Sequence, residues 1–290
     1  MNCIKCAIRF NPYFITPYDL NYMQVKDNRV SRPFHKIPRR LLWGILWAVI
    51  IGYCYVFYSN FVKPYSYRWK ALYGEVKYPK GTVRGLDVSH YQNDINWIRL
   101  KKDKIQNSPI SFVFIKATEG SDGIDPTFHF NFNKAKECGF IRGAYHFFTT
   151  QSSGFDQAVH FCNNVHLEDG DLPPVLDVEV DMEMSSLEEK TLNELINWLT
   201  VVENHYRVKP IIYASYRFKT KYLNAPIFND YPYWVAHYYV DSLEYEGKWN
   251  FWQHTDAGHV DGIDGYVDLD LFNGNAEMLS QMCISKYSEK

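Results

Sequence analysis

The sequence lacks the residue patterns on which many metal- and nucleotide-dependent enzymes rely. Its ten histidines are scattered, with no H-x-H or H-x-x-x-H pair to supply metal ligands. No G-x-S-x-G nucleophile elbow occurs, and glycine-containing segments such as KATEG lack the Lys-Ser/Thr ending of a phosphate loop. These absences predict a protein that works without a metal ion or cofactor.

Cysteine is scarce as well, with six residues in the whole chain. Cys3 and Cys6 have no second pair with which to complete a zinc site. Three more, Cys138, Cys162 and Cys283, allow one disulfide at most, which excludes a disulfide framework. No internal repeat or low-complexity segment is visible.

An excess of basic charge is missing from the larger part of the chain. Residues 84–290 hold eighteen Lys and Arg against thirty Asp and Glu, whereas residues 1–40 hold eight against two. The acidic part has no basic face on which to bind nucleic acid. Because residues 1–40 are basic and residues 84–290 are acidic, the two parts are expected to lie in different surroundings.

Residues 41–62, LLWGILWAVIIGYCYVFYSNFV, contain no charged residue. About 20 helical residues cross the roughly 30 Å core of a bilayer. The flank with Lys36, Arg39 and Arg40 is basic and Lys63 stands alone beyond the segment, so the positive-inside rule places the N-terminus in the cytoplasm. A cleaved signal peptide would have a shorter first region and a small-residue cleavage site. A lipoprotein signal would need a small residue before Cys54, where Tyr53 stands. A buried core helix is the third alternative, and we favour an uncleaved single-pass signal anchor.

The chain is therefore predicted to have four parts. They are a basic cytoplasmic segment (1–40), a transmembrane anchor (41–62), a juxtamembrane linker (63–83) and a domain of residues 84–290 that faces the periplasm or the cell wall.

The domain alternates between short β runs and helical stretches. Strands are expected at 85–89, 111–117, 141–148, 174–180, 210–215, 233–238, 250–255 and 266–272. Helices are expected at 94–104, 126–138, 153–165, 186–206 and 216–224, with a short one after Asn275. Five β/α units followed by three further strands predict an α/β fold, a TIM-like parallel barrel.

Four carboxylates lie late in predicted strands, namely Asp87, Asp177, Glu179 and Asp268. In PPVLDVEV, Asp177 and Glu179 are two residues apart and so share one face of a strand with Val175. The other face is apolar and suits a helix layer, so the acids are expected to point into the barrel mouth. Like charges close together raise one another's pKa, as a general acid for glycoside cleavage requires. Solvated loop acids are the alternative.

Eight segments in order resemble those of family 25 glycoside hydrolases, the Chalaropsis-type lysozymes. They are RGLDVSHYQNDINW, FVFIKATEG, RGAYHFF, PVLDVEV, PIIYAS, YWVAHY, FWQHT and VDLD, and they span about residues 84–273. The resemblance implies a barrel of five β/α units and three strands. It also implies a muramidase, which hydrolyses the β-1,4 bond between N-acetylmuramic acid and N-acetylglucosamine in peptidoglycan glycan strands.

By the same resemblance, Glu179 matches the general acid and Asp177 the partner that orients the acetamido group of the substrate. Asp87 and Asp268 match the remaining pocket carboxylates. Lys116, Tyr145, Tyr213 and Gln253 match pocket-lining positions, where packing is the alternative to substrate contact. Trp252, like Trp234, is a sugar platform or a core residue.

The sequence leaves two alternatives for the stereochemical course of the reaction and several for the substrate. An inverting enzyme needs room for a water between its carboxylates, whereas a retaining one uses a closer carboxylate or the N-acetyl group of the substrate. We favour acetamido assistance. The alternatives to a muramidase are a glycosidase on another N-acetylhexosamine polymer such as chitin, and a non-catalytic barrel that binds wall glycan. Family members commonly carry wall-binding repeats, whereas this chain has a predicted anchor, which favours remodelling of the wall of its own cell. We expect a monomer.

Overall fold

The computed structural model describes residues 38–62, 83–179, 189–238, 240–243 and 247–285. The predicted basic segment up to residue 37, the predicted linker up to residue 82 and the predicted helix start at 186–188 lie outside these residues. The described residues belong to two units, an N-terminal apolar helix and a barrel domain, and each is described by itself.

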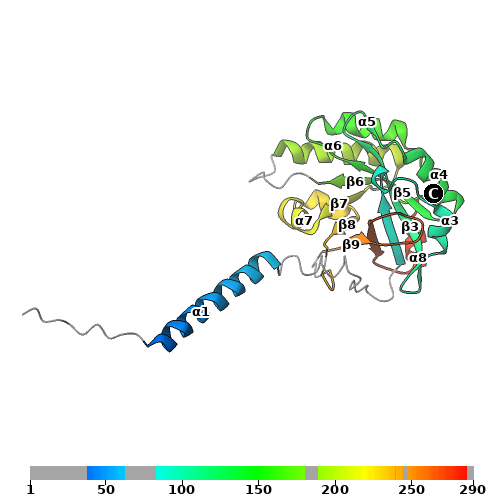
Figure 1. Cartoon of the computed structure of the whole chain (residues 1–290). Coiled ribbons are helices and arrows are strands. Elements are labelled where there is room, and N and C mark those ends of the chain that lie inside the picture. The colour runs from blue at the N-terminus through cyan, green and yellow to red at the C-terminus, as the bar shows by residue number, and fades with distance from the viewer. Residues whose placement is uncertain (1–37, 63–82, 180–188, 239, 244–246, 286–290) are drawn as a thin grey trace, which may run out of the picture. The chain divides into compact units, whose positions relative to one another are not determined.

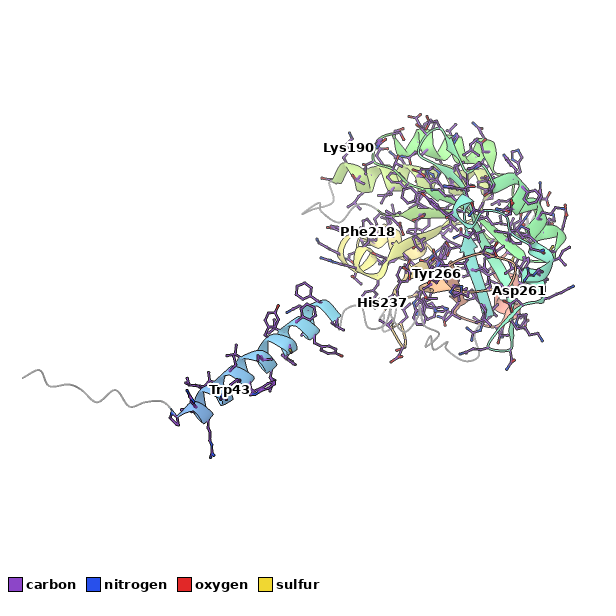
Figure 2. All side chains as sticks on the ribbon, in the orientation of Figure 1. Trp43, Lys190, Phe218, His237, Asp261 and Tyr266 are labelled. Atoms are coloured by element: carbon purple, nitrogen blue, oxygen red, sulfur yellow. The ribbon has the colours of Figure 1, made fainter. Side chains whose placement is uncertain are left out.

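The apolar segment forms a continuous helix. α1 spans Arg39–Phe57 and continues as a π-helix, η1, over Tyr58–Val62. No residue of α1 is buried, and Figure 2 shows its side chains, Trp43 among them, projecting from several sides of the helix. By length and composition alone, Arg39–Val62 is able to cross a membrane, a test that a signal sequence also passes. The helix is thus confirmed, and its role as an anchor stays a prediction.

Eight strands close a barrel, as the sequence predicts (Figure 1). Around the ring they are β1 (Val83–Val88), β3 (Ser108–Glu119), β5 (Ile141–Phe147), β6 (Val175–Val178), β7 (Ile211–Ser215), β8 (Tyr233–Ala236), β9 (Phe251–Gly258) and β10 (Val267–Phe272). Pairing of β1 with both β3 and β10 completes the ring. The short strands β2 (Lys104–Ile105) and β4 (Gly123–Ile124), which pair with β3, were not predicted.

Helices follow each of the first five ring strands. They are α3 (Trp97–Lys102), α4 (Phe128–Glu137), α5 (Gly154–Asn164), α6 (Glu189–Tyr206) and α7 (Tyr216–Tyr222). Figure 1 shows α5 and α6 side by side on the outside of the strands. Serine side chains cap two of these helices, because Ser153 accepts from the N–H of Asp156 and Ser215 from that of Phe218. The 3₁₀-helices η3 (His90–Gln92) and η4 (Pro226–Asp230) and the C-terminal helix α8 (Ala276–Met282) complete the order.

The last strand departs from the expected parallel barrel. β10 runs antiparallel to both of its neighbours, whereas β8 and β9 are parallel to each other. Residues 259–266 alone join β9 to β10. Parallel strands need a crossover of a dozen or more residues, so this connection is too short for one. The expectation of a parallel strand is therefore wrong at β10, and the start of β10 lies where the other strands end.

Two apolar layers stabilise the domain. Val175 belongs to the cluster inside the barrel, whereas Leu176 and Val178 belong to the cluster between barrel and helices. The predicted alternation along this strand is confirmed. Inside the barrel, the ring of Phe114 stacks on that of Trp234 with 4.4 Å between centroids. A Cβ on Gly143 would lie 2.6 Å from the Phe114 ring, so the absent side chain makes room for it. These rings fill the interior below the site.

Candidate active site

A cavity of about 300 Å³ opens at the mouth of the barrel, where most of the strands end and β10 begins. It brings together all four predicted acids and four of the five predicted substrate-binding residues. Its lining consists of Asp87, Ser89, Tyr91, Gln92, Lys116, Tyr145, Phe147, Asp177, Glu179, Tyr213, Trp234, Tyr238, Gln253 and Asp268.

Asp87 and Asp268 face each other across two neighbouring strands. They are register partners in the antiparallel pair of β1 and β10. Asp268 is the second residue of β10, so its expected place late in a strand is wrong. It reaches the mouth because β10 runs in the opposite direction to β1. The amide Nε2 of Gln253 donates to both carboxylates, at 2.6 Å to Asp87 and 3.3 Å to Asp268.

Asp177 and Glu179 approach the cavity from β6. Asp177 is the third residue of this strand and is 7% exposed, whereas Glu179 follows the strand and is exposed at the rim. Among the described residues, no donor reaches Oδ1 of Asp177, although this atom is buried. An incoming ligand with an N–H or O–H group would satisfy it.

Tyr213 on β7 links Glu179 to the centre of the cavity. Its hydroxyl lies 2.6 Å from Oε1 of Gln253 and 3.0 Å from Oε1 of Glu179. The hydroxyl of Tyr238 also donates to Oε1 of Gln253, at 2.6 Å. Both ends of the Gln253 amide are thereby engaged, its NH₂ group by two acids and its carbonyl by two tyrosines.

Burial is the largest cause that raises the pKa of three of the site carboxyls, and the like charges that the sequence predicts come after it. For Asp87 burial is the largest cause, followed by the charges of Asp268 and Asp270. For Asp177 burial comes first and the charge of Glu179 second, while Lys116 opposes them. Burial and then Asp256 raise the pKa of Asp268 to about 7. These three carboxyls therefore keep their protons to a higher pH than they would in water.

Lys116 lies near the end of β3, between two hollows. Its Nζ is 2.7 Å from Oε2 of Glu119 and 4.7 Å from the centre of the Phe147 ring. It lines the central cavity and also an adjoining hollow of about 420 Å³ that includes His90 and Asp125. The central cavity and this second hollow therefore adjoin at Lys116.

Trp252 is not brought to the cavity. Neighbouring residues of a strand point to opposite faces, so Gln253 points into the barrel and Trp252 away from it. Trp252 is buried, and its indole Nε1 donates to the carbonyl of His237 at 2.9 Å. Trp234, which the sequence leaves between platform and core, lines the cavity and packs its ring 4.5 Å from that of Tyr213.

Asp270 is the main residue that sequence reasoning missed. It is 1% exposed and accepts a 2.8 Å hydrogen bond from Nε1 of Trp234. The signal was present in VDLD, where Asp270 shares a strand face with Asp268. Tyr238 was missed as well, because nothing in YWVAHY separates its role from that of a core tyrosine.

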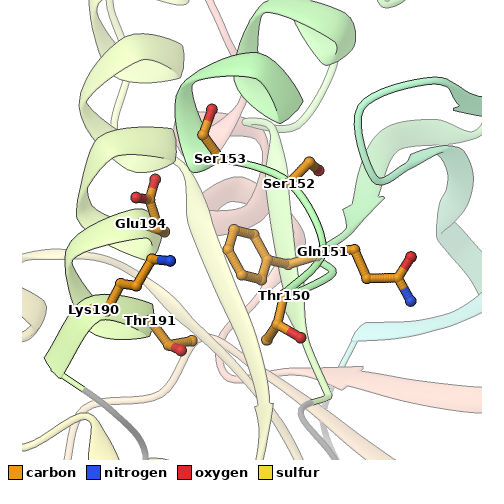
Figure 3. Close-up of a pocket in the computed structure, with 8 residues that line it drawn as sticks. Thr150, Gln151, Ser152, Ser153, Lys190, Thr191 and Glu194 are labelled. Atoms are coloured by element: carbon orange, nitrogen blue, oxygen red, sulfur yellow. The ribbon is translucent and has the colours of Figure 1, made fainter.

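A further hollow of about 470 Å³ lies between the starts of α5 and α6 (Figure 3). Residues 150–153 form one wall, and Lys190, Thr191 and Glu194 form the other. The carboxylate that lines this hollow already has a hydrogen-bond partner, since Oε2 of Glu194 accepts from the backbone N–H of Gly154 at 2.7 Å. No predicted site residue lines this hollow, so we place the chemistry at the barrel mouth. Across the described ranges, no group of three or more His, Cys, Asp and Glu is arranged to hold a metal ion.

Comparisons with known proteins agree with this geometry. Residues 86–263 match the family model for glycosyl hydrolases family 25. An uncharacterized Escherichia coli K12 protein, YegX, is 41% identical over 232 residues, which are 79% of this chain and 81% of that protein. Lysozyme M1 of Streptomyces globisporus is 33% identical over 68% of this chain and 70% of its own length. A solved family 25 glycosyl hydrolase from Bacillus anthracis is 35% identical with a TM-score of 0.64, covering 72% of this chain and 97% of that one.

Proposed function

This chain belongs to glycosyl hydrolase family 25 and is a glycoside hydrolase of the lysozyme type, and from that premise we propose a membrane-anchored muramidase. Its substrate is the glycan strand of peptidoglycan, which it cleaves at the β-1,4 bond between N-acetylmuramic acid and N-acetylglucosamine. The observation that carries the proposal is the meeting of Asp87, Asp177, Glu179 and Asp268 around one cavity.

In this proposal Glu179 is the general acid. Its place at the exposed rim suits a group that must reach the oxygen between two sugars of a polymer. The proton passes from the Glu179 carboxyl to the glycosidic oxygen as the bond to C1 breaks, and the sugar beyond that oxygen leaves with a hydroxyl. A water molecule later gives Glu179 a proton back as it attacks C1.

Asp177 is proposed to orient the acetamido group of the sugar in the cavity. Its buried Oδ1 has no donor among the described residues, and an acetamido N–H supplies one. The acetamido carbonyl oxygen then forms the bond to C1 as the glycosidic bond breaks. Water opens this intermediate, so the product keeps the configuration of the substrate. Anomer-resolved NMR of the first products tests this step, and an inverted initial anomer would exclude it.

The remaining acids and the neighbouring side chains are proposed to hold the sugar rings. Asp87 and Asp268 are tied to each other through Gln253, and Tyr145 and Lys116 lie on the adjoining wall. Burial raises the pKa of the Tyr145 hydroxyl well above its usual value, which keeps it a neutral hydrogen-bond donor. Polar groups of this kind are expected to bind hydroxyl and acetamido substituents.

The place of action is proposed from α1. A helix of this length, uncharged after Arg39 and Arg40 at its start, suits a single pass with a cytoplasmic N-terminus. The barrel would then face the wall of the same cell and remodel it as a monomer. Fractionation of cells tests this proposal. The full chain is expected in the membrane fraction, with the barrel digested by protease added outside the cytoplasmic membrane, and protection of the barrel would exclude it.

The central experiment is mass spectrometry of fragments released from purified peptidoglycan by the full chain in detergent. We expect fragments that end in reducing N-acetylmuramic acid. Glu179→Gln should lower the rate about 100- to 10,000-fold, because general acid catalysis contributes about 10²–10⁴-fold. Glu137→Gln is a matched control, since Glu137 pairs with Lys134 on the exposed face of α4.

Three results would contradict the proposal. Cleavage of chitin oligomers but not peptidoglycan would indicate a different N-acetylhexosamine polymer. Tight binding without release of reducing ends would indicate a glycan-binding barrel. Glu179→Gln turnover near that of the wild type would remove Glu179 from its role.

A further inference from the structure

Tyr91 is an exposed aromatic residue at the rim of the cavity, and the mechanism given above does not use it. It lies on η3, shortly after the strand that carries Asp87, and it lines the same cavity as the acids. It is 76% exposed, the largest value for a large apolar residue in the described part of the barrel domain. Single exposed apolar residues are common on protein surfaces, so exposure alone assigns no role to it.

The backbone on either side of Tyr91 is held by hydrogen bonds within the same turn. The hydroxyl oxygen of Ser89 accepts from the N–H of Tyr91 at 3.3 Å, and the N–H of Ser89 donates to Oε1 of Gln92 at 2.9 Å. This reciprocal pair is a capping box, which fixes the first turn of a helix. The exposed ring of Tyr91 therefore projects from a turn whose own backbone is already fixed.

The ring of His90 packs against that of Tyr91, with 4.1 Å between centroids and 35° between planes. Oδ2 of Asp125 fixes His90, because it accepts from the backbone N–H at 2.9 Å and from ring Nδ1 at 2.8 Å. The Asp125 side chain is fully buried, and its other oxygen accepts from the N–H and the hydroxyl of Thr127. Burial raises the pKa of Asp125, but hydrogen bonds from Thr127 and His90 bring it below its usual value. A buried, ionised carboxylate thus anchors the side chain that supports Tyr91.

An exposed aromatic ring fixed in this way suits one kind of ligand surface, the C–H face of a sugar ring. The C–H groups on a pyranose face carry a small positive charge, and the face of an aromatic ring is negative. The acids and hydroxyls inside the cavity suit the polar substituents of a sugar, whereas Tyr91 offers an apolar surface at its rim. Because the ring is fixed before the ligand arrives, binding loses little affinity to ordering it.

We propose that Tyr91 is a binding platform for one sugar ring of the glycan strand, and that His90, tied to Asp125, is the residue that positions it. The inference rests on the glycan substrate of the proposed function. It does not rest on the role of Glu179, because Tyr91 acts on binding and takes no part in breaking the glycosidic bond.

Calorimetric titration with soluble peptidoglycan glycan strands, freed of their peptides, tests the platform. The full chain in detergent carries Glu179→Gln, so that the strands are cut only slowly. Adding Tyr91→Ala should raise Kd about 5- to 20-fold, the loss expected for one aromatic contact and the area it buries. Tyr91→Phe keeps the ring and should stay within about threefold of the parent chain. An unchanged Kd in Tyr91→Ala, or equal loss in both variants, would overturn the platform.

Phe155→Ala is the matched control. Phe155 is a 56% exposed aromatic residue on α5 that does not line the cavity, so its removal should leave Kd unchanged. In a chain that keeps Glu179, Tyr91→Ala should raise KM by about the same factor as Kd and leave kcat within about twofold, because the contact is equal in ground and transition states. A fall in kcat with KM unchanged, or equal loss of binding in Phe155→Ala, would overturn the binding role.

A double-substitution cycle tests the positioning role of His90. His90→Ala removes the ring that packs against Tyr91 and its bond to Asp125, and it should raise Kd about 3- to 10-fold. Combined with Tyr91→Ala, it should add less than about twofold, because His90 acts through Tyr91. Losses that multiply would overturn the positioning.

The binding measurement separates this inference from the proposed function. Failure of the unsubstituted chain to release reducing ends would refute the proposed muramidase, while the calorimetric comparison at Tyr91 would still decide the platform. If the chain with Glu179→Gln alone bound no glycan strand, the platform would be overturned as well.

Discussion

Replacing Asp268 by Asn should make the barrel more stable at neutral pH while it impairs the enzyme. Asp268 faces Asp87 across the barrel mouth and accepts a hydrogen bond from Gln253. Asparagine keeps its size and its acceptor oxygen. What the substitution removes is a carboxyl whose pKa burial, ahead of the charge of Asp256, raises from 3.8 to about 7.

The sign of the effect follows from proton binding. The folded chain holds the Asp268 proton until about pH 7, whereas the unfolded chain releases it near pH 3.8. Between these values the folded state binds more protons, so its free energy of unfolding falls as the pH rises. A pKa difference of about 3 corresponds to about 4 kcal/mol at 1.36 kcal/mol per unit. Because the carboxyl opens on a solvent-accessible cavity, we expect about half of this, about 2 kcal/mol.

Thermal unfolding of the full chain in detergent at pH 3.5 and pH 7.5 measures this effect. For a domain of about 200 residues, about 2 kcal/mol raises Tm by about 4–8 °C, and this gain should appear at pH 7.5 alone. Asp264→Asn, on the exposed connection before β10, should change little at either pH. A gain of equal size at both pH values, or a loss at pH 7.5, would refute the reasoning.

Three further substitutions test individual side chains. Tyr213→Phe removes the hydroxyl that contacts the proposed acid, so kcat should fall about 10- to 100-fold with KM nearly unchanged in steady-state assays. Trp252→Phe loses the hydrogen bond to His237 and should cost about 1 kcal/mol in denaturant unfolding, with activity unchanged, because Trp252 lies outside the cavity. Lys116→Met removes a charge that lowers the pKa of Asp177, so the acidic limb of kcat/KM should move to higher pH. A limb that stays in place would exclude ionised Asp177 from the reaction.

Much of the barrel could be predicted because its strands obey a simple periodicity. Alternation along PVLDVEV places Val175 inside the barrel and Leu176 and Val178 against the helices, as observed. The same alternation predicts that Asp177 and Glu179 meet in one cavity. Strand direction is not encoded in this periodicity. The antiparallel β10 follows instead from the short connection at residues 259–266, a signal that was present and not used.

The site was harder to predict where two residues of the same type occupy different environments in the fold. Trp234 and Trp252 both lie in predicted strands and look alike in the sequence. Because successive side chains of a strand point to opposite faces, a shift of one residue decides whether a tryptophan lines the cavity, as Trp234 does, or lies in the outer layer, as Trp252 does. Asp270 was missed because a fully buried acid is rare without a cation. Its partner, the indole of Trp234, comes from a different strand, 36 residues away in the sequence.

The hydrogen bonds of the cavity also explain why the substrate should bind at Asp177. Gln253 engages Asp87 and Asp268 with its NH₂ group, so these two acids already have a donor before any ligand arrives. Asp177 keeps a buried oxygen that no donor in the described part of the chain reaches. A ligand gains most where it satisfies a buried group that the protein leaves unpaired, since it pays no cost for breaking an existing bond. An acetamido N–H at Asp177 therefore adds a hydrogen bond, whereas the same group at Asp87 would have to displace the amide of Gln253.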